Sequence, residues 1–167
     1  AEGATTIDVA ESTYKDSAGN NNSAATQFNW TYDDTAPTLS SVAAADATYK
    51  VGQNIDITVT WSETVTKTDT PTLTLSNGAT ATYNSGDGSA AFVFRYTVAE
   101  GDTASADLSV SSYSGTITDT AGNAAAAASG DLGSVIVDGD APDFVSVAAS
   151  DGSCLLYTSP SPRDMWT

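Results

Sequence analysis

Two short motifs recur in this chain, in the same order and at nearly the same spacing. Asp33–Pro37 (Asp-Asp-Thr-Ala-Pro) returns as Asp138–Pro142 (Asp-Gly-Asp-Ala-Pro), an offset of 105 residues. Asp16–Asn20 (Asp-Ser-Ala-Gly-Asn) returns as Asp119–Asn123 (Asp-Thr-Ala-Gly-Asn), an offset of 103 residues. Self-similarity at one long period is typical of tandem structural units. We therefore expect copies of one module, and we interpret the sequence as a window on a longer array.

The repeat predicts four parts. Residues 1–33 form the C-terminal part of a preceding module, residues 34–138 a complete module, and residues 139–153 the start of a following one. Residues 154–167 break the repeat and hold the only Cys, the only Met and two of the five Pro. This segment resembles translated sequencing-adaptor read-through from a metagenomic assembly, so we treat it as a non-native tail and exclude it from fold reasoning. The alternative is a genuine Pro-rich linker.

Alternating apolar residues predict short strands throughout the complete module. The clearest runs are 54–61 and 92–98, each with four apolar residues on one face. Asn77-Gly78 predicts a tight hairpin between two further strands. No stretch has helical periodicity. The expected strands are 39–44, 54–61, 71–76, 79–83, 92–98, 106–113 and 134–137. Seven short strands in about 100 residues indicate an all-β fold, an immunoglobulin-like β-sandwich.

The N-terminal segment carries its own strand signal. Phe28, Trp30 and Tyr32 alternate, and at the repeat offset Trp30 and Tyr32 align with Val135 and Val137. We therefore expect the last strand of each copy to bury the same face. Packing in a core or between modules is favoured for Trp30 over a ligand platform, because its period-2 neighbours are also apolar.

Composition excludes several classes of function. Five Lys and Arg stand against 21 Asp and Glu, a net charge of −16, and such a surface repels nucleic acid and anionic membranes. The chain has no His and one Cys, which excludes Ser/His/Asp and Cys/His catalysis, His-ligated zinc and disulfide frameworks. It contains no apolar run long enough to span a bilayer and no signal-peptide pattern. A hard cation held by oxygen ligands remains as a source of rigidity.

Chain direction predicts where acidic loops meet. The connection holding Asp119 and Asn123 should return to the end where the module begins, beside Asp33 and Asp34, so we predict a calcium site from these four residues. At the opposite end, Asp138 and Asp140 should approach the loops of Asp46 and Asp102, with Asp107 a further candidate, in a site completed only by the next module. The alternative is that Asp and Asn before Gly are simply good turn residues.

Two other constellations have an ordinary explanation. Glu63 and Glu100 would be the acid pair of a glycosidase, but no pocket signal joins them, and surface acids are favoured. Trp61, Tyr83 and Tyr96 would form a sugar-stacking strip, but two of them lie on alternating apolar faces, so core packing is favoured. We expect Arg95, which points outward, to pair with a neighbouring acid such as Glu63.

The order and spacing of several motifs resemble a known family. These motifs are 49–52 (Tyr-Lys-Val-Gly), 59–63 (Val-Thr-Trp-Ser-Glu), 73–78 (Leu-Thr-Leu-Ser-Asn-Gly) and 95–102, together with the two repeated motifs. Over residues 1–153 the chain resembles the bacterial Ig-like repeats of large secreted or surface adhesins of the RTX or biofilm-associated type. The resemblance implies modules strung into fibres at bacterial surfaces, commonly with calcium at their junctions.

The functional prediction is a non-enzymatic spacer module of a repetitive bacterial adhesin, extracellular or at the cell surface. Its expected partners are neighbouring Ig-like modules of the same chain, with any host or surface glycan or protein bound through distal domains. We expect no nucleic-acid binding and no membrane insertion. The alternative is a glycan-binding β-sandwich module of a secreted enzyme, which an exposed row of aromatic side chains would favour.

Overall fold

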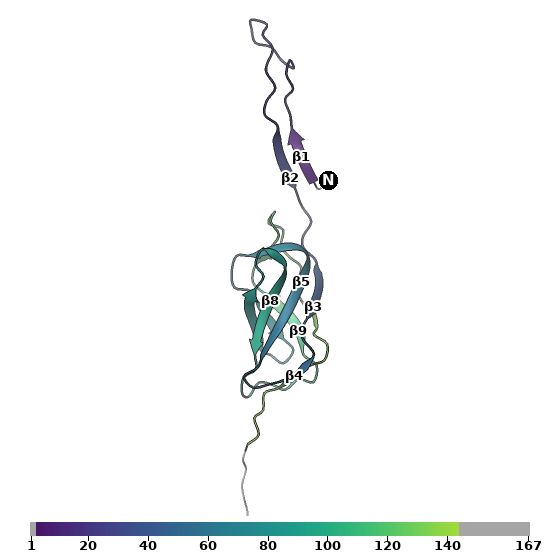
Figure 1. Cartoon of the computed structure of the whole chain (residues 1–167), viewed down its shortest axis with the longest axis vertical. Helices are drawn as coiled ribbons and strands as arrows, with labels where there is room; N and C mark the ends of the chain where they lie inside the picture. The colour runs from purple at the N-terminus through teal and green to yellow at the C-terminus, as the bar shows by residue number, and fades with distance from the viewer. Residues whose placement is uncertain (1–2, 144–167) are drawn as a thin grey trace, which may run out of the picture.

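The structure is a computed structural model, and it describes residues 3–143 (Figure 1). Every regular element in this range is a strand. The strands are β1 (Gly3–Ile7), β2 (Phe28–Tyr32), β3 (Leu39–Ala43), β4 (Ala47–Lys50), β5 (Asn54–Lys67), β6 (Thr72–Leu75), β7 (Thr80–Ser85), β8 (Ser89–Thr97), β9 (Ser109–Ser114), β10 (Ile117–Thr118), β11 (Gly130–Asp131) and β12 (Val135–Asp138). The predicted tail, 154–167, and most of the predicted following module lie outside the described residues.

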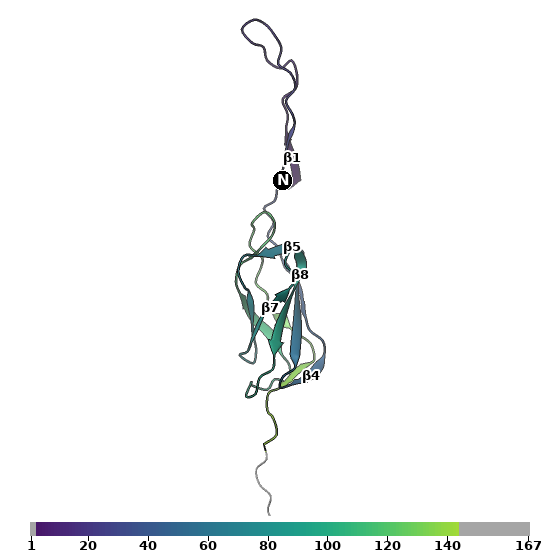
Figure 2. The ribbon, with the colours of Figure 1, turned by 60° about the vertical axis from the view of Figure 1, so that its left-hand side comes forward.

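Strands β3 to β12 form a β-sandwich, which confirms the predicted fold class. The hydrogen-bonded path runs β10-β5-β8-β7-β6-β9-β11, and β3 pairs with β5. This path curls back on itself, because Gly130 of β11 lies against the side chain of Val42 in β3. Strands β12 and β4 pair in parallel as a separate two-stranded sheet. The strands thus enclose a single core between two layers (Figures 1 and 2).

The core follows from the period-2 pattern of β5 and β8. Their antiparallel register places Ile57 opposite Phe94 and Val59 opposite Phe92, and all four side chains are fully buried. Trp61 is buried and meets Phe92 edge to face, with ring centroids 5.2 Å apart. Each large apolar side chain buried in this way contributes roughly 1.5–3 kcal/mol. The other fully buried large residues are Ile55, Val65, Leu73, Leu75, Val98, Leu108, Ile117 and Val135.

Several strand boundaries differ from the prediction. Strand β5 continues to Lys67, whereas its alternation ended at Trp61 in the sequence, and its pairing with β8 shifts register between Thr60 and Val65. The buried face continues on the same alternate positions, from Trp61 to Val65, but the charged Glu63 stands between them and interrupts the apolar alternation in the sequence. Strands β4, β10 and β11 were not predicted. They are two to four residues long and exist through tertiary pairing alone.

The predicted pairing of Arg95 with a neighbouring acid is confirmed, and the acid is Asp56 where Glu63 was named as the example. Arg95 binds the carboxylate of Asp56 through Nε (2.7 Å) and Nη2 (2.8 Å). The register of β5 and β8 places Asp56 directly opposite Arg95, so the two side chains stand side by side on the outer face. The hydrogen bond from Arg95 lowers the pKa of Asp56.

Strands β1 and β2 form a separate hairpin that projects beyond one end of the sandwich (Figures 1 and 2). Its aromatic side chains are uncovered: Trp30 is 43% exposed and Tyr32 42% exposed, whereas Val135 is fully buried and Val137 1% exposed. The predicted shared burial of the last strand therefore holds in the sandwich and does not hold in the hairpin. Residues 139–143 leave the sandwich at the opposite end.

Candidate functional site

The loop Asp119–Asn123 lies at the end of the sandwich that faces the hairpin. Asp119, which follows β10, is 3% exposed and organises the loop around its carboxylate. Its Oδ1 accepts hydrogen bonds from the backbone N–H groups of Ala121 (2.8 Å), Gly122 (2.7 Å) and Asn123 (2.9 Å). Gly122 has φ +99°, a conformation that glycine adopts without strain. Gly122 therefore allows the tight turn of this loop.

This environment favours the charged form of Asp119. Burial raises the pKa of the carboxyl, but hydrogen bonds from the Asn123 side chain and from three backbone N–H groups outweigh it. The pKa of Asp119 therefore lies below its ordinary value. The carboxylate stays ionised at neutral pH and contributes a fixed negative charge to this end of the sandwich.

The first copy of the motif has the same internal structure except at its glycine, where Gly19 N donates to the Asp16 backbone carbonyl at 3.1 Å. Asp16 Oδ1 accepts from the backbone N–H groups of Ala18 and Asn20, both at 2.9 Å, and Oδ2 accepts from Asn20 Nδ2 at 2.9 Å. Gly19 has φ +90°. In each copy the Asp backbone N–H also donates to the carbonyl of the Asn four residues later, at 3.0 Å. The five-residue motif thus encodes one loop conformation, formed twice.

Within the described residues, 3–143, only the second copy contacts a linker. Asn123 Nδ2 donates to Asp119 Oδ2 at 2.8 Å and to the backbone carbonyl of Asp33 at 3.1 Å, and the Thr35 carbonyl lies at the limit of hydrogen bonding, 3.5 Å away. Pro37 is buried, and its carbonyl accepts from Ala126 N at 2.8 Å. The entry linker is therefore held to the sandwich at two successive points.

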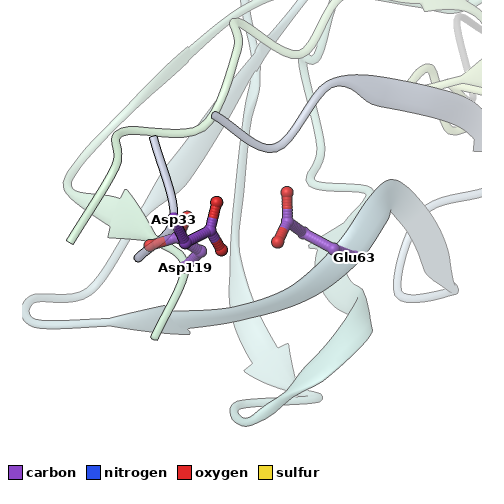
Figure 3. A group of neighbouring side chains, drawn as sticks. All are labelled: Asp33, Glu63 and Asp119. Atoms are coloured by element: carbon purple, nitrogen blue, oxygen red, sulfur yellow. The ribbon is translucent and has the colours of Figure 1, made fainter. Parts of the chain in front are cut away.

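Three carboxylates gather above this loop. One oxygen from each of Asp33, Glu63 and Asp119 lies within 4.8 Å of the others, and Figure 3 shows the Glu63 carboxylate facing the two aspartates. An open hollow between the base of the hairpin and β5 is lined by Asp33 and Glu63. Three ionised carboxylates this close repel one another, and oxygen donors in such a group are the ligands that calcium takes.

The structure distributes the four predicted ligands of this end differently. Asp33 and Asp119 come together as expected. Asp34 is exposed outside the group, and its Oδ2 accepts from the Tyr32 hydroxyl at 3.1 Å. Asn123 presents an amide nitrogen to Asp119 and Asp33, so ligation through its oxygen would require the amide to turn over.

Glu63 is the residue that sequence reasoning missed as a member of this group. It lies between Thr60 and Val65, where the pairing of β5 with β8 shifts register, and beyond Trp61, where the predicted strand ended. Its distance from Asp119 in the sequence gives no signal either. Only the pairing of β10 with the last residues of β5 brings Asp119 to this stretch.

At the opposite end the predicted residues are less concentrated. Asp138 and Asp140 are exposed, and Asp138 Oδ1 accepts from Asp140 N at 3.1 Å. Between them, Gly139 is buried, and its carbonyl accepts from Gly101 N at 2.9 Å. Within residues 3–143, no group of three acids close enough to hold a cation forms at this end. A second site completed by a following module stays a prediction.

The acids of the loops at this end have local roles. Asp102 Oδ2 accepts from the Tyr96 hydroxyl and from Ala99 N, both at 2.7 Å. Burial and the hydrogen bond to Asp102 raise the pKa of Tyr96 to about 12. Asp46 Oδ1 accepts from Ser134 N at 3.0 Å. The Asp102 carboxylate thus closes a local turn, and the Asp46 carboxylate joins the loop before β4 to the residue before β12.

The structure separates the other constellations. Glu63 lies beside Asp33, whereas Glu100 accepts from Ala141 N at the other end, so they form no acid pair. Trp61 and Tyr96 are 2% and 3% exposed, and Tyr83 is partly buried against Phe92, which confirms that these aromatics belong to the core.

Fold and loops together define an Ig-like β-sandwich module. A family model described as a bacterial Ig-like domain matches residues 33–135. The chain therefore belongs to the bacterial Ig-like domain family, whose members are commonly extracellular or on the cell surface and typically non-catalytic. No curated protein and no solved structure matches the chain. Among the described residues, no helix is long and apolar enough to cross a membrane.

Proposed function

We propose that this chain is a structural spacer from a repetitive bacterial surface or secreted adhesin, with modules joined end to end. The observation that carries the proposal is the doubled Asp-x-Ala-Gly-Asn loop. The loop shares four hydrogen bonds at residues 16–20 and 119–123, and the second copy holds the linker that enters the sandwich. Repeats that each contact only their neighbours are typical of extended, quasi-one-dimensional proteins.

The placement of the two connections supports this proposal. The hairpin leaves one end of the sandwich and residues 139–143 leave the other, so successive modules would extend the chain (Figure 1). A missing remainder of the preceding module would also explain why the aromatic face of the hairpin is exposed. Trp30 and Tyr32 occupy the positions of Val135 and Val137, which a complete sandwich buries. We therefore assign residues 1–33 to a preceding module and residues 139–153 to a following one.

Calcium is the proposed cofactor of the junction. Asp33, Glu63 and Asp119 supply three oxygens within 4.8 Å, and backbone carbonyls and water would complete the six to eight ligands that calcium takes. A cation here would remove the repulsion among the carboxylates and tie the linker residue Asp33 to β5 and to the Asp119 loop. A junction closed in this way would resist bending.

Isothermal titration calorimetry with calcium tests this site on the full chain. We expect binding with a dissociation constant of roughly 10⁻⁴–10⁻³ M, the range of extracellular modules, and a higher melting temperature at saturation. Glu63→Gln and Asp33→Asn should weaken binding at least tenfold. Asp34→Asn is the matched control, because it removes the adjacent charge outside the group. The calcium proposal fails if the unmodified chain shows neither heat nor thermal stabilisation.

A second candidate function has one observation in its favour. Phe28, Trp30 and Tyr32 form an exposed row on β2, and sugars stack on such rows. The candidate is therefore a glycan-binding module. A glycan array probed with the full chain and with Trp30→Ala would support it if a signal is lost in the variant. No signal from either chain leaves the spacer as the better account.

A further inference from the structure

We propose that Asn123 is a clasp that holds the linker Asp33–Thr35 against the sandwich without a metal ion, and that the Asp-x-Ala-Gly-Asn loop is a docking surface for the backbone of an extended linker. This inference deepens the proposed function, on which it rests for the biological use of a fixed junction.

The orientation of the Asn123 amide is set by its neighbours. The three atoms around Nδ2 are the Asp119 carboxylate oxygen and the backbone carbonyls of Asp33 and Thr35, and all three accept hydrogen bonds only. An amide oxygen in this place would face three other oxygens. Asn123 therefore donates one hydrogen to Asp119, and its second hydrogen is left for the linker.

Asp119 prepares Asn123 for this role. Its Oδ1 fixes the loop through three backbone N–H groups, and its Oδ2 receives the first amide hydrogen of Asn123. The Asn side chain is thus positioned before the linker arrives, which reduces the entropy lost when the linker binds. The same preparation is present at Asp16 and Asn20, where Asn20 Nδ2 donates to Asp16 Oδ2.

The clasp recognises backbone and not side chains. Both contacts of Asn123 on the linker go to main-chain carbonyls, so a linker can change its residues and keep its fit. The two linkers of this chain vary in this way: Asp-Asp-Thr precedes Ala-Pro in one, and Asp-Gly-Asp precedes it in the other. The ligand of the loop is therefore an extended segment ending in Ala-Pro, with the proline anchored next to it, as Pro37 is through Ala126 N.

Asn20 occupies the position of Asn123 in the first loop, but it holds no linker among the described residues. Among residues 3–143, its side-chain amide has Asp16 as its acceptor and no linker carbonyl within hydrogen-bond distance. The pair Asn20 and Asn123 thus separates two effects that a single substitution would mix. Truncation of either residue removes the bond inside the loop, but only truncation of Asn123 removes a bond to a linker.

Backbone ¹⁵N relaxation on the full chain in EDTA tests the clasp. In the unmodified chain, Asp34 and Thr35 should have order parameters close to those of the sandwich strands, about 0.85. In Asn123→Ala they should fall below about 0.6, the range of flexible segments. Asn20→Ala should leave both linker residues unchanged. If Asn123→Ala also leaves them unchanged, or if Asn20→Ala loosens them equally, the clasp is overturned.

Two further measurements distinguish the clasp from calcium binding. Asn123→Asp keeps the size of the side chain and removes its donor, so the linker should loosen in EDTA as it does in Asn123→Ala. If the linker of the unmodified chain is flexible in EDTA and becomes ordered only when calcium is added, calcium holds the linker and the clasp proposal is overturned. In the unmodified chain, nuclear Overhauser contacts should join the Asn123 side-chain amide hydrogens to the linker. Their absence would also overturn the clasp proposal.

Discussion

The two linkers of this chain share a motif and differ in their surroundings. In Asp33–Pro37 the proline is buried, the Asp33 carbonyl accepts from Asn123, and the Asp33 carboxylate joins two other acids. In Asp138–Pro142 the proline and both aspartates are exposed, and the contact to the sandwich is made by Gly139. The motif alone does not bury the proline or gather acids. The module that the linker enters supplies these contacts, through Glu63 of β5, Asp119 and the backbone N–H of Ala126.

The strands that precede the two linkers also differ in burial because their surroundings differ. Strands β2 and β12 align at the repeat offset, yet β12 buries Val135 and Val137 while β2 exposes Trp30 and Tyr32. Strand β12 pairs with β4, and Val137 also bonds to Ser105, whereas β2 pairs with β1 alone in the part of the chain that the structure describes. An isolated two-stranded hairpin cannot cover its apolar face. Burial is thus a property of the completed sandwich, and an apolar strand alone does not achieve it.

Truncation of the aligned residues Val135 and Trp30 should give the largest difference in the free energy of unfolding. Val135→Ala should lower the free energy of unfolding of the sandwich by about 2–3 kcal/mol, because it removes buried methyl groups and leaves a cavity. Trp30→Ala should change it by less than about 0.5 kcal/mol, because its side chain is exposed outside the sandwich. Urea unfolding followed by circular dichroism measures both. A loss of equal size for Trp30→Ala would show that the hairpin packs on the sandwich in solution.

The second positions of the two linkers should also respond differently. Gly139→Ala should destabilise the sandwich by roughly 1–2 kcal/mol, because an added methyl group would collide with the backbone of Asp102. Asp34→Ala should have almost no effect on urea unfolding, because Asp34 is exposed. A silent Gly139→Ala would mean that the exit linker is not seated as the structure places it.

Acid titration should give the smallest effect and distinguish the two Asp loops. The pKa of Asp119 is lowered in the folded protein, so its contribution to stability is fully present above the unfolded value of about 3.9 and is lost as the pH falls through the folded value. Melting temperatures measured from pH 6 to pH 2 should therefore fall less steeply in Asp119→Asn, which starts less stable. The pKa of Asp16 is also lowered, chiefly by Asn20, but Asp16→Asn should reproduce the unmodified curve because its loop lies outside the sandwich. Matching curves for both variants would contradict a specific role for Asp119.

Much of the sandwich was predictable from alternation and turn chemistry. The apolar faces of 54–61 and 92–98 became the core, and Asn77-Gly78 became the hairpin between β6 and β7, with Gly78 at φ +86°. These features depend on neighbouring residues, so a local pattern contains them. The four-residue β4 and the two-residue β10 and β11 were missed because each exists only where a distant strand offers hydrogen bonds.

The candidate site was predictable in its location and not in its membership. Chain direction placed the Asp119 loop beside Asp33, and the structure brings their carboxylates together. The inclusion of Glu63, the exclusion of Asp34 and the use of Asn123 as a hydrogen-bond donor depended on the β5 irregularity and on side-chain directions.

By itself the sequence determined the repeat, the all-β character, the acidic surface and the conformation of the Asp-x-Ala-Gly-Asn loop, because each depends on composition or on residues adjacent in the chain. Tertiary structure alone decided which loop holds a linker, which acids meet and which aromatics are covered. Those outcomes require segments as far apart as residues 33 and 123 to be held within hydrogen-bond distance, and only the packed sandwich provides that proximity.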